Sequence, residues 1–314
     1  MREVGRRSPA EFASYVLRFT FYSSHFLPPN VDRNRTLKPS PDLPIGIFDS
    51  GVGGLTVVRQ VHRVLPREDL IYLGDTARVP YGTKSPATVI RFACEDTQFL
   101  VRQRVKAVVV ACNSASAWAV PTLEREFAPL PVWGVILPGA REALRRTRTG
   151  RIGVIGTSAT IRSQAYTKAI LARDDGAHIC ARACPLLVPL VEEGWLRHPV
   201  TLAVLREYLS PLLRRRIDTL VLGCTHYPLL KKAIRAVAGR GMSLVDSAES
   251  CAAFVRERLE ELKLLSRRRR LGVIRPFVTD EVERFAEFAE RFLAMPTEPA
   301  VKVDLEPWPG ERRR

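Results

Sequence analysis

Two cysteines stand where they could carry out chemistry on one substrate. Cys112 lies in VVVACNSAS and Cys224 lies in LVLGCTHYP, and in both stretches an apolar run stops at the cysteine and small polar residues follow. An unperturbed thiol has a pKa of about 8.5, so it can be tuned to take up or release a proton near neutral pH. Two thiols on opposite sides of a carbon stereocentre can invert it, because one removes the proton and the other delivers a proton to the opposite side. The pair therefore favours a two-base racemisation.

Each thiol would need a neighbour that supports its thiolate or relays its proton. Asp49 lies in FDSG at the end of an apolar run, His226 follows Cys224 by two residues, and Glu192 lies in VPLVEEG. Each of the three also has a purely structural interpretation. These are a turn or cap aspartate, a capping or core histidine, and a solvated loop carboxylate.

An amino-acid substrate also carries a carboxylate and an ammonium group that must be held. Hydroxyl groups and backbone N–H groups at strand ends and helix N-termini can hold a carboxylate. The sequence offers such groups beside the cysteines and in the stretches DSGVGG and DTARVPYG, at Ser50, Tyr81, Gly82, Ser114, Ser116 and Thr225.

Cofactor and metal sites are not expected from the motifs. DSGVGG lacks the GK[ST] of a P-loop and the GxGxxG spacing of a dinucleotide fingerprint, so a nucleotide site is disfavoured. Cys180 and Cys184 are four residues apart, without the second ligand pair that a zinc site needs. We therefore expect no cofactor and no metal.

Short apolar segments alternate with segments of helical period from Pro44 onward. This alternation predicts parallel sheets with crossover helices. The expected strands are 44–51, 70–75, 106–116, 131–137, 151–157, 218–228 and 243–250. The expected helices are 55–65, 85–104, 119–127, 139–147, 158–173, 199–216, 228–239 and 252–265. The stretch 181–194 is expected to be strand and loop.

The order of these segments repeats within the chain. IGIFDSGVGG (45–54) resembles IGVIGTSATI (152–161), and each cysteine follows at a similar distance. We therefore predict an α/β fold of two similar doubly wound parallel-sheet domains, related by pseudo-twofold symmetry, with the active site in the cleft between them. Ligands bind beyond the carboxyl ends of parallel strands, so the two cysteines would lie on opposite walls of that cleft. The alternative is chance, because any α/β chain contains similar segments.

Length and composition limit the domain organisation. The chain has 314 residues, and 46% of them are hydrophobic, which indicates a globular chain of two ordinary domains. We expect an N-terminal extension (1–43), a first domain (44–140) that a returning segment (about 251–308) completes, a second domain (141–250) and a basic tail (309–314). No apolar run approaches the roughly 20 residues that span a bilayer, and no clean signal peptide is present, so we expect no membrane contact and a cytoplasmic location.

The net charge of +16 raises the question of a nucleic-acid partner. The arginines are scattered, however, with short runs at 214–216, 267–270 and 312–314, and no helix-turn-helix, zinc-finger or RNP pattern occurs. A basic protein that binds nucleic acid, with structural cysteines, remains an alternative. It leaves the twin cysteine motifs unexplained.

Several stretches together resemble the glutamate racemase family. They are PIGIFDSGVGGLTV, YLGDTARVPYGTKS, VVVACNSASA, VPLVEEG, LVLGCTHYPLL and VDSAES, in the order and spacing of that family, over about Pro44 to Leu305. The resemblance implies a cofactor-independent racemase that interconverts L- and D-glutamate for bacterial peptidoglycan, acts at a site between two α/β domains and often forms a homodimer. Some members also restrain DNA gyrase, so such a contact is a further partner to consider.

The resemblance also implies roles for individual residues. Cys112 would act on the D-isomer and Cys224 on the L-isomer, with Asp49, Glu192 and His226 as supporting catalytic residues. The substrate-contact positions would be Asp49, Ser50, Tyr81, Gly82, Asn113, Ser114, Thr225 and His226. The family usually has threonine at the position of Ser114, so the contact there is expected to be looser. Aspartate or another amino acid of the same superfamily remains an alternative substrate.

Overall fold

The computed structural model describes residues 39–309. The expected extension 1–43 therefore lies outside the described residues except for 39–43, and the expected tail 309–314 lies outside them except for Pro309. No helix within the described range is long and apolar enough to cross a membrane.

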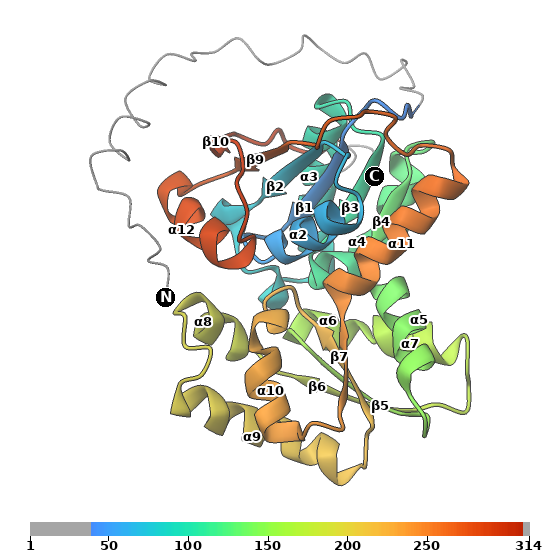
Figure 1. The fold of residues 1–314 in the computed structure, drawn as a ribbon, viewed down its shortest axis with the longest axis vertical. Coiled ribbons are helices and arrows are strands. Elements are labelled where there is room, and N and C mark those ends of the chain that lie inside the picture. The colour runs from blue at the N-terminus through green and yellow to red at the C-terminus, as the bar shows by residue number, and fades with distance from the viewer. Residues whose placement is uncertain (1–38, 310–314) are drawn as a thin grey trace, which may run out of the picture. The chain divides into compact units, whose positions relative to one another are not determined.

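The first sheet has six parallel strands in the order β10-β9-β2-β1-β3-β4 (Figure 1). Its strands are β1 (Ile45–Asp49), β2 (Leu70–Gly74), β3 (Ala107–Val110), β4 (Val132–Gly134), β9 (Ile274–Val278) and β10 (Val301–Lys302). Strands β9 and β10 come from the far end of the chain, so the C-terminal segment returns to the sheet with which the described chain begins.

The second sheet has four parallel strands in the order β6-β5-β7-β8. They are β5 (Arg151–Gly156), β6 (His178–Ala183), β7 (Thr219–Gly223) and β8 (Ser243–Asp246). This order repeats β2-β1-β3-β4 of the first sheet, strand for strand. The expected α/β fold with two similar parallel sheets is therefore confirmed, and the two cysteines follow the corresponding strands β3 and β7.

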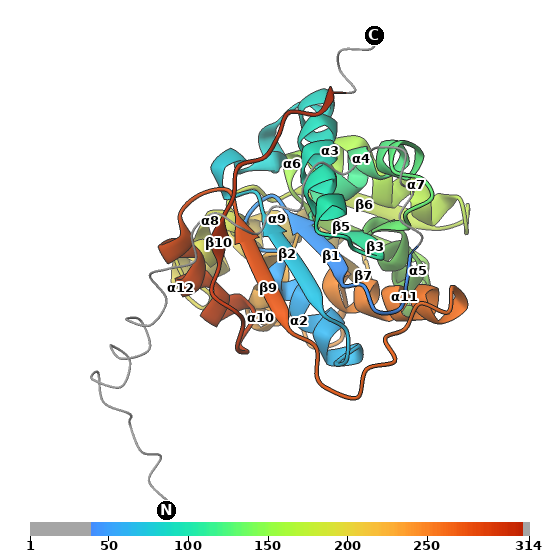
Figure 2. The ribbon, with the colours of Figure 1, turned by 90° about the horizontal axis from the view of Figure 1, so that it is seen from above.

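Helices connect the strands and cover both sides of the first sheet. In Figure 2, α2 and α3 lie on opposite sides of the sheet that contains β1 and β2. Strand β1 is buried on both sides, with Ile45 and Ile47 in the core that includes α2 and Phe48 in the core that includes α3. The α-helices are α2 (Leu55–Val64), α3 (Pro86–Arg102), α4 (Asn113–Glu126), α5 (Ile136–Arg146), α6 (Ser158–Ser163), α7 (Ala165–Leu171), α8 (Leu187–Glu192), α9 (Pro199–Arg214), α10 (Lys231–Ala238), α11 (Ser247–Glu261) and α12 (Val282–Phe292). Three 3-10 helices are η1 (Thr76–Arg78), η2 (Tyr81–Thr83) and η3 (Tyr227–Leu230).

The chain passes between the two sheets through α5 and α11. Helix α5 follows β4 of the first sheet but packs on β7 and β8, whereas α11 follows β8 of the second sheet but packs along α2. The predicted domain boundary at 140 falls inside α5, and the one at 250 falls inside α11. Each helix therefore belongs to one sheet by sequence and to the other by packing, and the domain boundaries stay predictions.

The helix expected over 158–173 is divided in two. Gln164 adopts the left-handed conformation with φ 56°, and α6 ends where α7 begins. The hydroxyl of Ser163 donates to the carbonyl of Thr160 at 2.6 Å and accepts from the N–H of Ala165 at 3.0 Å. This local bonding offers the backbone an alternative to the helix, which the hydrophobic period does not reveal.

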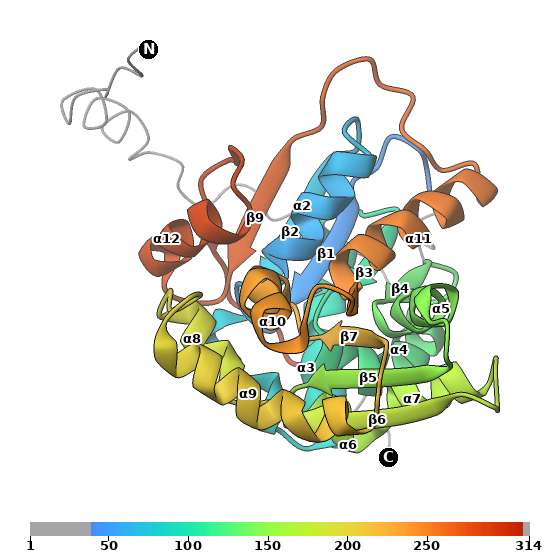
Figure 3. The same ribbon diagram turned by 60° about the horizontal axis from the view of Figure 1, so that its bottom comes forward.

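The stretch 181–194 contains a helix that was expected to be loop. Helix α8 follows β6 and ends at Glu192, and α9 packs against both α8 and α10 (Figure 3). A helix of six residues has fewer than two turns, so it shows no clear period in the sequence. Glu192 therefore lies at a helix end and not in a solvated loop.

A buried ion pair and its hydrogen bonds connect four segments that lie far apart in the sequence. Lys106 is fully buried, and its ammonium group donates to Glu68 at 2.5 Å and to the carbonyls of Pro41 and Leu264. The basic run 267–270 follows directly, and Arg268 and Arg270 pair with the buried Asp69. Part of this basic run is therefore used within the fold.

We expect Lys106→Ala to destabilise the protein by about 3–5 kcal/mol, because it leaves Glu68 buried without its cation. Denaturant-induced unfolding measures the loss. Lys232→Ala is the matched control, since Lys232 is exposed. Equal stability of the two variants would contradict this account of the ion pair.

Candidate active site

Each cysteine lies at the point where the strand order of its sheet reverses. In the first sheet β1 lies between β2 and β3, and in the second sheet β5 lies between β6 and β7. Helices cross over in opposite directions from such a central strand, which leaves a crevice at the carboxyl ends of the strands. Cys112 follows β3 and precedes α4, and Cys224 follows β7 directly. Both thiols are buried.

The strand register places one hydroxyl residue beside each cysteine. Phe48 is paired with Val110, so Ser50 lies level with Cys112, and the thiol of Cys112 donates to the hydroxyl of Ser50 at 3.5 Å. In the second sheet Gly156 is paired with Gly223, which places Thr157 level with Cys224. Thr157 is thus the counterpart of Ser50. Thr157 was not among the residues predicted from the sequence, although aligning the two repeats residue by residue identifies it.

Side chains from both sheets meet at this position. The hydroxyls of Ser114 and Thr157 are 2.8 Å apart, and the hydroxyl of Thr56 donates to the carbonyl of Thr225 at 3.0 Å. The hydroxyl of Tyr166 donates to the side-chain oxygen of Asn113 at 2.8 Å. The carboxyl ends of the two sheets are therefore joined directly, with the cysteine turns of both in the contact.

Cys224 is connected to a carboxylate through a histidine. Nδ1 of His226 lies 3.9 Å from the sulfur of Cys224, and Nε2 lies 3.1 Å from Oε1 of Glu192. Burial acts to lower the pKa of His226, but its hydrogen bonds with Cys224 and Glu192 outweigh burial and raise that pKa to about 10. Burial acts to raise the pKa of Glu192, but its hydrogen bond with His226 outweighs this and lowers it. The arrangement holds an imidazolium beside the thiol.

Cys112 has different surroundings. Burial raises the pKa of its thiol to about 12, and the nearby charge of Asp49 acts in the same direction. The backbone N–H of Ala115, in the first turn of α4, opposes this rise, as do the N–H and the hydroxyl of Ser50. Cys112 is therefore held in its protonated form.

Asp49 lies between the two sets of groups. Burial raises its pKa, whereas the charge of His226 acts to lower it. One carboxyl oxygen accepts from the N–H of Gly51 at 3.2 Å, and the other has no hydrogen-bond partner within the range 39–309. The same carboxylate thus influences the Cys112 thiol on one side and the His226 imidazole on the other.

The C-terminal helix α12 holds the pair formed by Glu192 and His226. The guanidinium of Arg291 donates to the backbone carbonyl of Glu192 at 2.6 Å, and the ring of Phe292 meets the ring of His226 edge-on with centroids 5.3 Å apart. The sequence analysis missed both residues. They lie far from the motifs in sequence, and no local pattern marks them.

The remaining predicted contact residues fall into two groups. Gly82 lies so close to Thr157 that an added Cβ would be 2.9 Å from that side chain's own Cβ, so the backbone reaches the contact between the sheets. The hydroxyl of Tyr81 is turned away, toward Asp75 and Asp96, so Tyr81 can offer a substrate only its backbone. The hydroxyl of Ser116 donates to the carbonyl of Val110 and accepts from Val135, so it is used within the fold.

The two parallel sheets, each with a cysteine just beyond the carboxyl end of an equivalent strand, define an α/β protein built from two similar units. The profile of the Asp/Glu/hydantoin racemase family matches residues 45–255. A glutamate racemase of Syntrophus aciditrophicus (strain SB) is 51% identical over 269 residues, which cover 85% of this chain and 99% of the relative.

Solved structures agree with the sequence match. The glutamate racemase isoform RacE1 of Bacillus anthracis is 40% identical with a TM-score of 0.81, over 84% of this chain and 98% of that one. The glutamate racemase of Francisella tularensis, solved in complex with D-glutamate, is 37% identical with a TM-score of 0.79, over the same shares of the two chains. The chain belongs to the Asp/Glu/hydantoin racemase family. It is an isomerase.

Substituting Glu192→Gln should lower the pKa of His226, because a neutral amide no longer stabilises the imidazolium. His226 in the unaltered protein stays cationic up to about pH 10, and in the variant it becomes neutral at a lower pH. We expect the alkaline limb of the pH profile of kcat/KM to move in the same direction. An NMR titration of the His226 ring measures the pKa directly.

Glu193→Gln is the matched control for this titration, since Glu193 is the adjacent carboxylate and is exposed. It should leave the His226 titration unchanged. If the two variants titrate alike, Glu192 does not set the charge of His226.

Proposed function

We propose that this chain interconverts L- and D-glutamate without a cofactor, by removing the Cα proton on one side and adding a proton on the other. The observation that carries the proposal is the placement of Cys112 and Cys224 after corresponding strands of two sheets whose carboxyl ends are in contact. The substrate follows from the relatives, because curated racemases that are about half identical over nearly their whole length are glutamate racemases.

The two thiols have complementary roles in each direction. From L-glutamate, Cys224 as thiolate takes the Cα proton, the electron pair of the C–H bond stays on the substrate, and Cys112 gives its thiol proton to the opposite side of Cα. The reaction ends with Cys224 protonated and Cys112 as thiolate, which is the form needed to start from D-glutamate. No net proton is gained or lost.

The electrostatics around Cys112 favour its thiol form at rest. The imidazolium of His226 stabilises negative charge on Cys224, and Glu192 stabilises the imidazolium. Burial and Asp49 keep the proton on Cys112. The resting enzyme is therefore prepared for L-glutamate, and proton transfer to and from the substrate prepares it for the D-isomer.

The substrate carboxylate is proposed to bind at the start of α4. Asn113 and Ser114 occupy the first two positions of this helix, where free backbone N–H groups and the helix dipole favour an anion. Ser50, Thr225 and the backbone of Tyr81 and Gly82 complete the proposed contacts, with Asp49 and His226 beside the ammonium and Cα. The methyl group that a threonine would add at Ser114 is absent, so this contact is looser.

The proposed setting is the bacterial cytoplasm, where D-glutamate supplies peptidoglycan synthesis and where thiols stay reduced. All six cysteines lie among the described residues, and all are free thiols. Two of them must remain thiols for the proposed reaction. As the family resemblance implies, we propose that the chain acts as a homodimer.

The purified protein should abolish the optical rotation of L-glutamate without any added cofactor. In deuterated water, solvent deuterium should enter Cα of the product. Cys112→Ser and Cys224→Ser should each lower kcat by at least about 10²-fold, since a positioned acid or base contributes about 10²–10⁴-fold. Cys180→Ala is the control and should keep its activity, because Cys180 lies in β6 outside the site.

L-Aspartate assayed in parallel tests the substrate assignment. Faster turnover of aspartate than of glutamate would overturn that assignment while leaving the two-base chemistry in place. Full activity in either cysteine variant would overturn the two-base chemistry itself.

A further inference from the structure

A buried acidic cluster lies behind the Tyr81–Gly82 turn, and the proposed proton transfer at Cα does not involve it. Asp75 and Asp96 are fully buried, and Glu95 is nearly so. All three carboxyl groups contact the single guanidinium of Arg78. One positive charge therefore faces three acidic groups, so the cluster is not neutralised if all three are ionised.

The contacts of the Tyr81 hydroxyl show that one of the two neighbouring aspartates carries a proton. Its oxygen is within hydrogen-bond distance of Oδ2 of Asp75 and lies 2.9 Å from Oδ2 of Asp96. A phenol has one proton and can donate it to only one of the two carboxyl groups. At the other carboxyl group, the phenol oxygen and the carboxylate oxygen would both be acceptors. That contact is favourable only if the carboxyl group carries a proton of its own. One of the two aspartates is therefore a carboxylic acid.

The surrounding donors identify which aspartate it is. Asp75 accepts from Nε of Arg78 at 2.7 Å and from the hydroxyl of Thr279 at 3.0 Å, in addition to Tyr81. Apart from Tyr81, Asp96 has Nη2 of Arg78 at 3.2 Å. Donors thus surround Asp75 as they surround a carboxylate, and the extra proton belongs to Asp96. Burial, followed by the nearby charge of Asp75, also raises the pKa of Asp96 well above its usual range.

We propose that Asp96 is a positioning residue whose neutral carboxylic acid donates to the hydroxyl of Tyr81, so that Tyr81 donates to Asp75 and the Tyr81–Gly82 turn is held at the substrate site. The statement about the substrate rests on the proposed function. The assignment of the proton does not, because it follows from the hydrogen-bond geometry alone.

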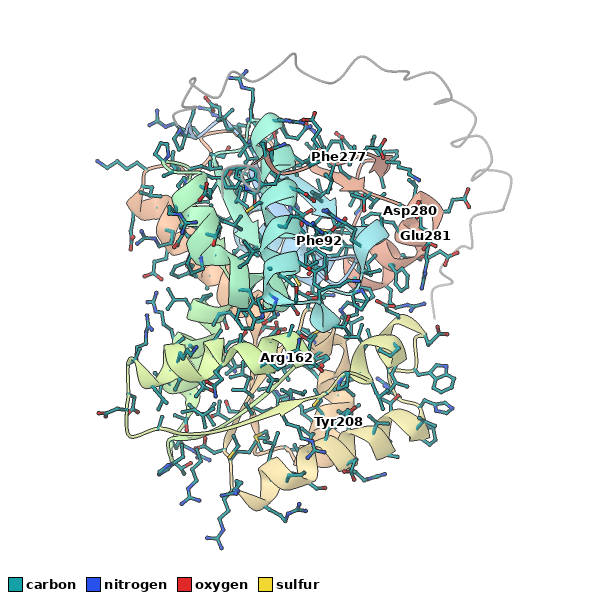
Figure 4. All side chains as sticks on the ribbon, turned by 180° about the vertical axis from the view of Figure 1, so that it is seen from behind. Phe92, Arg162, Tyr208, Phe277, Asp280 and Glu281 are labelled. Carbon is teal, nitrogen blue, oxygen red and sulfur yellow. The ribbon has the colours of Figure 1, made fainter. Side chains whose placement is uncertain are left out.

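Two further contacts hold the segment that leads into the Tyr81–Gly82 turn. From α3, the ring of Phe92 lies under the guanidinium of Arg78, with 4.1 Å between them. From the end of β9, the N–H and carbonyl of Asp280 bond to the hydroxyl of Thr76 at 2.7 Å and 2.6 Å. Figure 4 labels Phe92 on α3 and Asp280 beyond β9.

A change at Tyr81 must reach the substrate site because Gly82 has no free space. Gly82 is the next residue in the chain, and even a methyl group on it would collide with Thr157 of the second sheet. A displaced Tyr81 therefore moves a backbone segment that already touches the opposite sheet.

The charged and titratable groups around Asp96 come from three elements. They are Asp75, Arg78 and Tyr81 of the segment between β2 and α3, Cys94 and Glu95 of α3, and Tyr72 of β2. Because the folded protein keeps a proton that the unfolded chain releases, the contribution of Asp96 to stability is complete below its unfolded pKa and is lost as pH rises toward its folded pKa. The unaltered protein should therefore lose stability with rising pH relative to Asp96→Asn, which has no such proton.

Three variants test the proposal. Asp96→Asn keeps a donor toward Tyr81 and an acceptor toward Arg78, so we expect KM for glutamate to stay within about twofold of the unaltered value. Asp96→Ala removes the donor, and we expect KM to rise about five- to tenfold with a smaller change in kcat. Asp75→Asn makes the same isosteric change on the partner carboxylate, and we expect KM to rise as in Asp96→Ala, because an amide N–H₂ cannot accept from the surrounding donors.

Two further measurements do not depend on turnover. The Tm of Asp96→Asn minus that of the unaltered protein should grow between about pH 5 and about pH 9. The infrared spectrum of the unaltered protein should contain the carbonyl band of a protonated carboxylic acid, and Asp96→Asn should lack it. These two results decide the proposal even if Asp96→Ala does not fold.

Two outcomes would overturn the proposal. One is an Asp96→Asn variant that becomes less stable than the unaltered protein as pH rises, since Asp96 would then be an ionised partner of Arg78. The other is an equal increase of KM in Asp96→Asn and Asp96→Ala. A protein that fails to racemise glutamate would overturn the proposed function but leave the Tm and infrared results in force.

Discussion

Burial of the two thiols, Cys112 and Cys224, is the constraint on which the proposed reaction depends. A thiol must ionise to take a proton from carbon, and burial opposes ionisation because it removes water from the charged form. Groups at fixed positions around the thiols offset this effect, because they stabilise negative charge there. On one side these are the first backbone N–H groups of α4, and on the other they are the imidazolium of His226 and the carboxylate of Glu192. The N–H groups of α4 and the ring of His226 lie near the thiols because both cysteines stand where a strand ends and a helical segment begins, and Glu192 reaches His226 from the end of α8.

The repeated scaffold provides equivalent positions but unequal chemistry. The strand order 2-1-3-4 occurs twice, and the register places Ser50 and Thr157 in equivalent positions beside the two cysteines. The residues that set the charges break this symmetry. Asp49 at the end of β1 corresponds to Gly156 at the end of β5, so a carboxylate faces Cys112 where the second sheet has none in that position. In the proposed reaction the two cysteines exchange the thiol and thiolate forms, and this inequality favours the thiol form of Cys112 before L-glutamate binds.

The sequence predicted the features that have a local period or an internal copy. Buried strands appeared as apolar runs, and IGIFDSGVGG matched IGVIGTSATI, so the two sheets and the positions of both cysteines could be anticipated. Helix α8 was missed because it is too short to show a period, and the break at Gln164 was missed because side-chain bonds to the backbone cause it. Phe292, Arg291 and the Asp75–Asp96 cluster were missed for another reason: their effect comes from contacts between segments far apart in the chain.

The returning C-terminal segment connects these missed features. Its strand β9 pairs with β2, and the residues just beyond it bond to the segment that carries Asp75 and Thr76. Its helix α12 then contacts Glu192 and His226, which belong to the second sheet. One segment therefore holds the turn at the proposed substrate contact and also the Glu192–His226 pair beside Cys224. The proposed substrate contact and the surroundings of the His226 imidazolium therefore both depend on how this segment packs.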